Sequence, residues 1–339
     1  MSRQPETKQK QRGGIPLFWP LAALALLLLY NAVFTQDFLT LTIRNGQLYG
    51  SLVDILNRGA PIMLVAIGMT LVISTRGVDL SVGAVIAISG AIAAWLIVAH
   101  DTPPALVILL TLLGAALCGI WNGALVAFLD IQPIVATLIL MVAGRGIAQL
   151  ITQGQILTFR DPVINFIAGG SLFYLPFSVT IVVVTLALTA VLMRWTALGL
   201  FIESVGANEP AARLAGVNTT FVKVFVYTFC GICAGIAGLI AVSNISGADS
   251  NNAGLNAELD GILATVIGGT SLNGGRFFLV GSIVGALIIQ TLTTTILSSD
   301  VPPHYTLVVK SVVVLAVCLL QSDAMQASIR RLATKGGAA

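Results

Sequence analysis

Long apolar runs separated by short polar breaks make up most of the chain. Runs of about 20 apolar residues are typical of helices that cross a membrane. The pattern therefore predicts an all-α integral membrane protein, a polytopic helical bundle of about ten transmembrane segments. These segments are residues 15–34, 59–75, 82–99, 104–129, 132–152, 175–193, 220–243, 262–272, 276–297 and 305–322.

The first apolar run follows a basic stretch, as the core of a secretory signal would. It is longer than such a core and lacks a clear small-residue cleavage site, so we expect a retained first span. The sequence accordingly divides into a basic N-terminal tail (1–14), a transmembrane domain (15–322) and a C-terminal tail (323–339). Its longest loop, about 194–219, is too short to hold a hydrophobic core of its own.

The stretch ELDGILATVIGGTSLNGGR at 258–276 interrupts the pattern, because the eighth apolar segment is too short to cross a membrane alone. A phosphate-binding loop would need GxxxxGK[ST] after a strand, and no such lysine follows these glycines. Irregular backbone survives in a membrane only inside protein or beside water. We therefore interpret the stretch as a broken helix whose Thr270, Ser271 and Asn273 line or gate a polar pathway, with a plain short loop as the alternative.

A weak internal echo links residues 72–91 with residues 266–286. Each stretch has an apolar run, a polar break of Gly and Ser, and a second run dotted with glycine. Many transporters consist of two such halves, with broken helices at corresponding positions. The echo predicts a weak internal repeat.

Composition supports the membrane class. The chain is 57% hydrophobic and 9% charged, whereas a typical soluble domain has about 25% charged residues. A soluble protein of this size would need far more polar residues to cover its surface, so most of the surroundings must be lipid. The net charge of +3 gives no indication of nucleic-acid binding.

Lysine and arginine gather in alternate loops, which predicts the orientation. With the N-terminus inside, twelve of the seventeen basic residues fall on the cytoplasmic side, and both termini are cytoplasmic. The 194–219 loop is then cytoplasmic and the 244–261 loop external. Glu258 and Asp260 are expected at the outer mouth of a pathway, and Arg276 at the cytoplasmic edge. The outer loops hold three arginines, namely Arg44, Arg58 and Arg160.

A few polar side chains fall within or beside apolar segments. Arg145 must face a partner or water, as a structural pair or as a pathway residue. Lys310 is expected to snorkel or to form an intramembrane pair. Asp79 and Ser81 follow a span, where capping and gating are both open for Asp79. Asn122 is expected to hydrogen-bond between helices or to face the pathway.

The sequence lacks a set of residues that would support enzymatic or redox chemistry. Cys230 and Cys233 form CGIC, but they lie in an apolar run without the strand-helix context of a redox motif. The two histidines, His100 and His304, are not spaced as metal ligands, so no metal site is expected. An ion- or proton-driven secondary transporter would carry a coupling carboxylate in mid-span, and none is clearly placed there.

Five stretches resemble the permease subunits of ribose-type (carbohydrate uptake class 2) bacterial sugar ABC importers. Gly77–Gly83 resembles that family's GGIDLSVG, with Arg76 in place of the first glycine. Phe277-Phe278 departs from the family, which often has glycine there. The other stretches are Trp121-Asn122-Gly123 with residues 131–138, Gly144-Arg145-Gly146, the loop 206–218, and residues 258–275.

This resemblance implies an ATP-driven sugar importer of the inner membrane and not an enzyme. ATP and Mg²⁺ would be bound by a separate duplicated-cassette ATP-binding subunit, and this chain would bind no cofactor. A second permease copy or paralogue would complete the pathway, and a periplasmic sugar-binding protein would deliver the sugar. Residues 247–254 resemble galactofuranose importers in particular, which implies galactofuranose, with ribose, galactose or xylose as alternatives.

The resemblance also implies roles for two sets of residues. The cytoplasmic loop would dock into a groove on the ATP-binding subunit through a short helix that begins near Pro210. Arg213 is alternatively a topology residue of the positive-inside kind. The loop residues are Glu209, Ala211, Ala212, Arg213 and Gly216, and the outer arginines Arg44, Arg58 and Arg160 would contact the binding protein.

Overall fold

A computed structural model describes residues 17–44, 46–299 and 305–321. Each of the ten predicted segments overlaps with a helix, in the predicted order. These helices are α1 (Phe18–Phe34), α2 (Ser51–Ser74), α3 (Val82–His100), α4 (Pro104–Ala127), α5 (Pro133–Thr152), α7 (Phe177–Trp195), α10 (Thr219–Ile245), α11 (Ala257–Ile267), α12 (Leu279–Ser298) and α13 (Thr306–Gln321).

Seven of these helices, α2, α3, α4, α5, α7, α10 and α12, are long and apolar enough to cross a membrane. The all-α membrane class is therefore confirmed. Helices α1, α11 and α13 are shorter, so a count of ten crossings stays a prediction. The predicted tails, 1–14 and 323–339, lie outside the described residues.

Short elements fill the connections. Three further helices are α6 (Pro162–Gly169), α8 (Leu198–Ala207) and α9 (Glu209–Leu214). Three small antiparallel pairs of strands join β1 (Thr42–Arg44) to β2 (Gln47–Tyr49), β3 (Leu157–Thr158) to β6 (Gly247–Ala248), and β4 (Ser171–Leu172) to β5 (Leu175–Pro176). In the first pair Thr42 lies opposite Tyr49.

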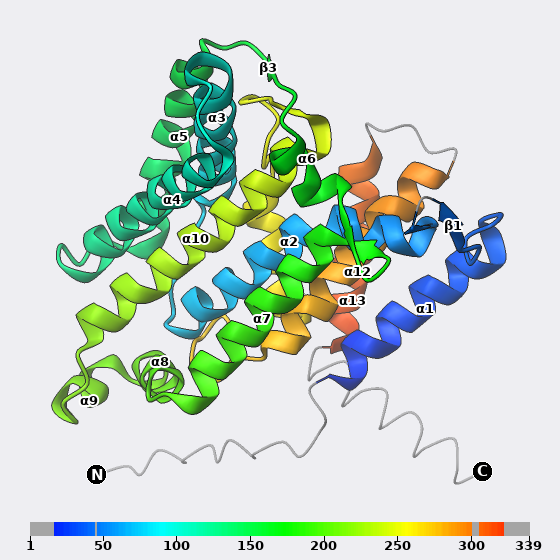
Figure 1. Cartoon of the computed structure of the whole chain (residues 1–339). Helices are drawn as coiled ribbons and strands as arrows, with labels where there is room; N and C mark the ends of the chain where they lie inside the picture. The colour runs from blue at the N-terminus through cyan, green and yellow to red at the C-terminus, as the bar shows by residue number, and fades with distance from the viewer. Residues whose placement is uncertain (1–16, 45, 300–304, 322–339) are drawn as a thin grey trace, which may run out of the picture.

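The bundle has two distinct ends. Strands β2 and β5 directly precede α2 and α7, and β6 follows α10, so the strand pairs mark one end, here called the sheet face. At the opposite end α8 and α9 join α7 to α10, and this end is called the α9 face (Figure 1). The Arg76 side chain at the end of α2 contacts Ala207 at the end of α8, so α2 also ends at the α9 face.

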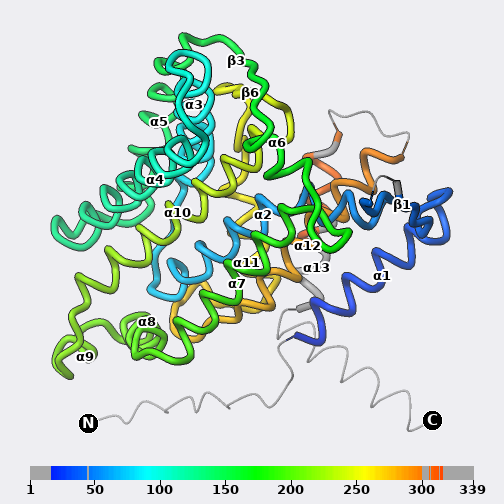
Figure 2. Tube along the Cα trace, viewed as in Figure 1, coloured from blue at the N-terminus to red at the C-terminus, as the bar shows by residue number. Residues whose placement is uncertain are grey.

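Helices α2, α3, α10 and α12 are mostly buried, whereas α4, α5 and α7 are mostly exposed. Figure 2 shows α2 and α11 in the centre of the bundle and α1 at one edge. Glycines let α4 and α10 approach closely, since a Cβ on Gly119 would meet the backbone of Tyr227 and a Cβ on Gly231 would meet that of Ala115. Small residues at a helix interface allow backbones to approach in this way.

Two helices begin inside the bundle instead of at a face. Helix α3 starts beside the first half of α10, because the Tyr227 hydroxyl donates to the carbonyl of Val78, just before α3 begins, at 3.4 Å. Helix α11 starts beside the middle of α2, where Gly261 packs against Val65. The predicted segment 262–272 is therefore wrong at both ends, since α11 runs from Ala257 to Ile267. The connectors 75–81 and 246–256 carry polar backbone into the bundle from opposite ends.

Candidate functional site: a central junction and the α9 face

Helices α3 and α11 begin beside each other inside the bundle, in a region here called the central junction. A carboxylate oxygen of Glu258, the second residue of α11, lies where a Cβ on Gly83 would be, and the carbonyl of Gly254 lies there too. The side chain of Glu258 thus packs against the first turn of α3, and Glu258 is only 5% exposed. Backbone N–H groups at the start of a helix favour a carboxylate in this position.

Asp79 lies one turn away in the same junction and is held by several donors. Its Oδ1 accepts hydrogen bonds from Ser81 N at 3.0 Å and Ser81 Oγ at 2.7 Å. Asn122 Nδ2 of α4 donates to Ser81 Oγ at 2.8 Å and to Asp79 Oδ1 at 3.3 Å. The bond from Ser81 N fixes the turn that leads into α3. The N-cap residue of α3 is Ser81, without a side-chain cap hydrogen bond, so Asp79 holds the preceding turn and does not cap the helix. All three residues are buried.

Arg145 of α5 satisfies its charge with backbone. Its Nη1 donates to the carbonyls of Ala253 at 2.5 Å and Ser250 at 3.4 Å. One and two turns further along α5, Gln149 donates to Asn251 Oδ1 at 2.8 Å and Thr152 Oγ1 lies 3.0 Å from Ser250 Oγ. The α5 helix therefore holds the connector that leads into α11. Arg145 serves to bind the backbone of this connector and not to form an ion pair.

The same connector is closed by Asp249, whose Oδ2 accepts from Asn252 Nδ2 at 2.7 Å. Its Oδ1 accepts from the backbone N–H groups of Asn251 and Asn252. These hydrogen bonds, the one from the Asn252 side chain foremost, hold the pKa of Asp249 below its usual value. The turn fixes the chain at the point where it leaves the sheet face.

The structure corrects the positions expected for two carboxylates. Glu258 and Asp260 do not lie at an outer mouth, because α11 begins five residues before the predicted segment and both fall in its first turn inside the bundle. Asp260 pairs there with Lys310 of α13, Oδ1 to Nζ, at 2.6 Å. The ion pair expected for Lys310 is present, and its partner is a residue that the sequence had placed outside.

The glycine-rich stretch reaches the α9 face. Thr270 is buried, and its Oγ1 accepts from Phe278 N at 3.1 Å, just before α12 begins. Ser271 and Asn273 are exposed in the loop between α11 and α12. The three side chains therefore lie beyond the end of α11, where the sequence placed a span, and a role in lining or gating a pathway stays a prediction.

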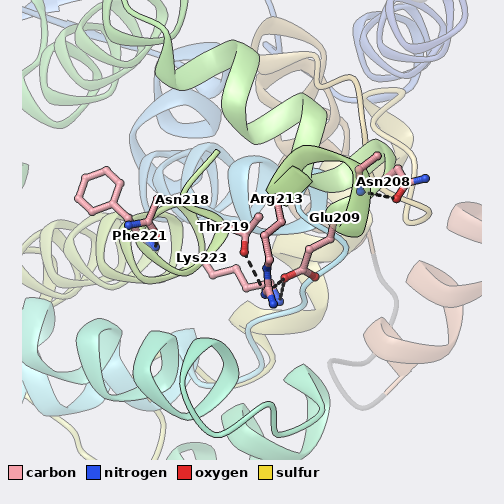
Figure 3. A network of polar contacts seen from close by, with 8 residues as sticks. Asn208, Glu209, Arg213, Asn218, Thr219, Phe221 and Lys223 are labelled. Carbon is pink, nitrogen blue, oxygen red and sulfur yellow. Dashed lines mark hydrogen bonds and ion pairs between the residues drawn. The ribbon is translucent and has the colours of Figure 1, made fainter. Parts of the chain in front are cut away.

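Helix α9 is a short, separate helix on the α9 face (Figure 3). The Asn208 side chain accepts from Ala211 N at 3.1 Å and starts the helix, with Pro210 in its first turn as predicted. Gly216 has φ of +87° and ends the helix. The N–H groups of Gly216 and Val217 bond the carbonyls of Arg213 and Ala212, which is the Schellman arrangement.

Charged side chains tie α9 to α10. Glu209 Oε1 lies 2.7 Å from Lys223 Nζ and 3.5 Å from an Arg213 nitrogen, and Arg213 Nη2 donates to Thr219 Oγ1 at 3.2 Å (Figure 3). Ala212, on the inner side of α9, is buried. Of the five predicted loop residues, Ala211, Arg213 and Gly216 are exposed.

Sequence reasoning missed Leu214, the last residue of α9. It is 92% exposed, more than any other large hydrophobic side chain among the described residues. A signal existed in the sequence, because a leucine between Arg213 and Ala215-Gly216 stands alone in a polar loop. An isolated apolar side chain at the tip of a helix is a candidate contact for a partner protein.

The three outer arginines are not brought together. Arg58 lies in α2 and Arg160 between β3 and α6, and both are exposed. Arg44 belongs to β1, which Figure 1 shows well apart from β3. Arg160 lines an open pocket of about 720 Å³ on the sheet face. The pocket also contains Asn165, whose buried Oδ1 accepts no hydrogen bond from the described residues.

No cluster of metal-ligating side chains occurs among the described residues. The five central candidates, by contrast, do converge: Asp79, Ser81 and Asn122 through hydrogen bonds, Glu258 through Gly83, and Arg145 through the connector that precedes Glu258.

Comparison with known proteins identifies the family that this chain resembles. Residues 51–318 match the family described as branched-chain amino acid transport system / permease component. The chain is 55% identical to the galactofuranose transporter permease protein YtfT of Escherichia coli (strain K12), over 94% of this chain and 93% of that protein.

Two further relatives are more distant. The chain is 40% identical to the fructose import permease protein FruF of Bifidobacterium longum (strain NCC 2705), over 90% of this chain and 87% of the other. It is 36% identical to the ribose import permease protein RbsC of Escherichia coli (strain K12), over 88% and 92%. No solved structure matches the chain.

Proposed function

Because the chain belongs to the family of branched-chain amino acid transport system / permease components, we propose that it is the permease subunit of an ATP-driven ABC importer for a sugar in a bacterial inner membrane. The observation that carries this proposal is the similarity to sugar permeases over almost the whole chain. The alternative, a secondary transporter driven by an ion gradient, has no relative among these proteins.

Galactofuranose is the proposed sugar, with ribose, galactose or xylose as alternatives. The relative that shares 55% of its residues with this chain is a galactofuranose transporter permease. A sugar is a neutral polyol, so its path needs hydrogen-bonding groups without an unpaired charge. Asn122 Oδ1 in the central junction is such a group, since it is buried without a hydrogen-bond partner among the described residues, whereas Asp79 and Arg145 are already engaged by donors and backbone carbonyls.

The energy for transport would come from a duplicated-cassette ATP-binding subunit that contacts α9. This chain has no phosphate-binding loop of its own. Ala211, Arg213 and Leu214 offer an outward surface, and Glu209, Ala212 and Gly216 hold the helix in shape behind it. Bound ATP and Mg²⁺ would therefore belong to the partner.

A second permease subunit, identical or paralogous, would complete the path. The α4, α5 and α7 helices expose apolar side chains along most of their length, as surfaces against lipid or another permease do. A periplasmic sugar-binding protein would dock on the sheet face. Arg160 and Arg58 are free of ion pairs with the described residues, which leaves both available to acidic side chains of that partner.

The orientation that this proposal requires follows the distribution of charge. The α9 face carries Arg76, Arg194, Arg213, Lys223 and Arg276, whereas the described side chains of the sheet face include Arg58 and Arg160. An excess of basic residues on one face is typical of the cytoplasmic side. The α9 face would therefore be cytoplasmic.

Co-expression with candidate ATP-binding subunits, followed by purification and reconstitution with the sugar-binding protein, tests the function. We expect galactofuranose uptake that requires ATP, stops with vanadate and persists when ion gradients are abolished. Uptake that follows an ion gradient without ATP would overturn the proposal.

A substitution at Leu214 tests the proposed contact of α9 with the ATP-binding subunit. Leu214→Glu should lower the amount of ATP-binding subunit that co-purifies and lower uptake in parallel, because an acid replaces an apolar contact. Trp195→Ala, at another strongly exposed hydrophobic residue of the α9 face, is the matched control and should leave both unchanged. Unaltered co-purification with Leu214→Glu would exclude this contact.

A further inference from the structure

Three segments that are distant in sequence meet around the end of α2 on the α9 face. They are the end of α2 (Ser74 to Arg76), the junction of α8 with α9 (Gly206 to Asn208) and the glycine-rich loop between α11 and α12 (Asn273 to Gly275). Gly275 N donates to the carbonyl of Ser74 at 2.9 Å. A Cβ on Gly206 would overlap that carbonyl, so the backbones are in direct contact.

Arg76 joins all three segments. Its Nε donates to the carbonyl of Asn273 at 2.9 Å, and its Nη2 donates to the carbonyl of Ala207 at 2.7 Å. The planar guanidinium can bond two acceptors in fixed directions at once, which an ammonium on a flexible stem does less well. Gly274 brings the loop close enough, since a Cβ there would meet the Arg76 side chain.

The backbone of Arg76 adopts the left-handed conformation that glycine takes most readily. Its φ is +63°, and the N–H groups of Arg76 and Gly77 bond the carbonyls of Ile73 and Val72 at the end of α2. This is the helix-ending position at which glycine is usual. A glycine would suit the backbone here, whereas the arginine adds the two side-chain hydrogen bonds to the other segments.

We propose that Arg76 is a positioning residue that makes the α8–α9 junction, the end of α2 and the glycine-rich loop move as one unit. A displacement of α9 is then transmitted to α11 and α12, and through α11 to Glu258 in the central junction. This inference rests on the proposed contact of α9 with an ATP-binding subunit. It adds the route by which that contact reaches the centre of the bundle.

Arg76→Gly is the informative variant, because glycine suits φ of +63° and the change removes only the side-chain bonds. The ATP-binding subunit should still co-purify and hydrolyse ATP, whereas sugar imported per ATP should fall by at least about twofold. Arg276→Gly removes a like charge from the glycine-rich loop that Arg76 contacts, where no partner of Arg276 occurs among the described residues, and should leave this ratio unchanged. A native ratio in Arg76→Gly would overturn the proposal.

A distance measurement separates this inference from the function on which it rests. Spin labels on Leu200→Cys in α8 and Leu272→Cys in the loop, both exposed, should give one narrow distance that is the same with and without trapped nucleotide. Arg76→Gly should broaden it even without nucleotide, and Arg76→Lys should broaden it less. A native distance that changes on trapping would refute the rigid unit. If no ATP-binding subunit co-purified with the native chain, the proposed function would fail, and the nucleotide-free distances would still report on Arg76.

Discussion

Asp260 of α11 and Lys310 of α13 form an ion pair at 2.6 Å, with both side chains less than one-fifth exposed. Lys310 lies in the first half of α13, and Asp260 lies in the first turn of a helix that starts inside the bundle. The pair therefore joins the last described helix to the central junction. Each charge depends on the other, since neither has another ion-pair partner among the described residues.

Lys310→Met should destabilise the protein by about 3–5 kcal/mol, because it leaves the Asp260 carboxylate buried without its partner. The double variant Lys310→Met with Asp260→Asn removes both charges and should recover much of the loss. Thermal unfolding in detergent compares the stabilities of the native chain and the variants. A double variant that is less stable than either single variant would show that the two charges do not depend mainly on each other.

Gly83→Ala should disturb the central junction, because the added methyl group meets the Glu258 carboxylate and the Gly254 carbonyl. Overpacking of this kind costs about 1–3 kcal/mol, and sugar uptake should fall with it. Gly146→Ala in α5 is the control, since a Cβ there meets nothing within 4 Å. That change should be neutral or stabilise the helix by up to about 1 kcal/mol. Equal melting temperatures for the two variants would contradict the contact.

A membrane-impermeant maleimide can test the orientation in a background without the native cysteines. Ser271→Cys should be labelled in inside-out vesicles alone, and Phe173→Cys, at the exposed turn between β4 and β5, in intact spheroplasts alone. Thr270→Cys should stay unlabelled in both, because that position is buried. The opposite pattern for Ser271 and Phe173 would reverse the proposed orientation.

The apolar pattern predicted the helices well because burial in lipid requires long apolar runs with all backbone groups paired. Helix ends were harder to predict. The α2 helix begins at Ser51, eight residues before the predicted start, because Asp54, Asn57 and Arg58 continue the helix on the sheet face. Polar residues at the end of a span do not show where hydrogen bonding stops.

The central junction could not be located from sequence. The charge pattern placed Glu258 outside, yet its position is fixed by Gly83, a residue far away in the chain. Asp79 likewise depends on Asn122 of α4. These residue types were recognised as candidates, but their convergence is a tertiary property. The predicted repeat between 72–91 and 266–286 stays a prediction.

Because α3 starts in the middle of the bundle, the order of synthesis matters. The carbonyl of Val78 enters the membrane with α2 and α3, whereas Tyr227, whose hydroxyl donates to it, belongs to α10. Until α10 has been synthesised, this carbonyl lacks a donor that the complete bundle supplies, and unpaired polar groups are costly in such surroundings. We therefore expect the early helices to complete their packing only after α10 has been inserted.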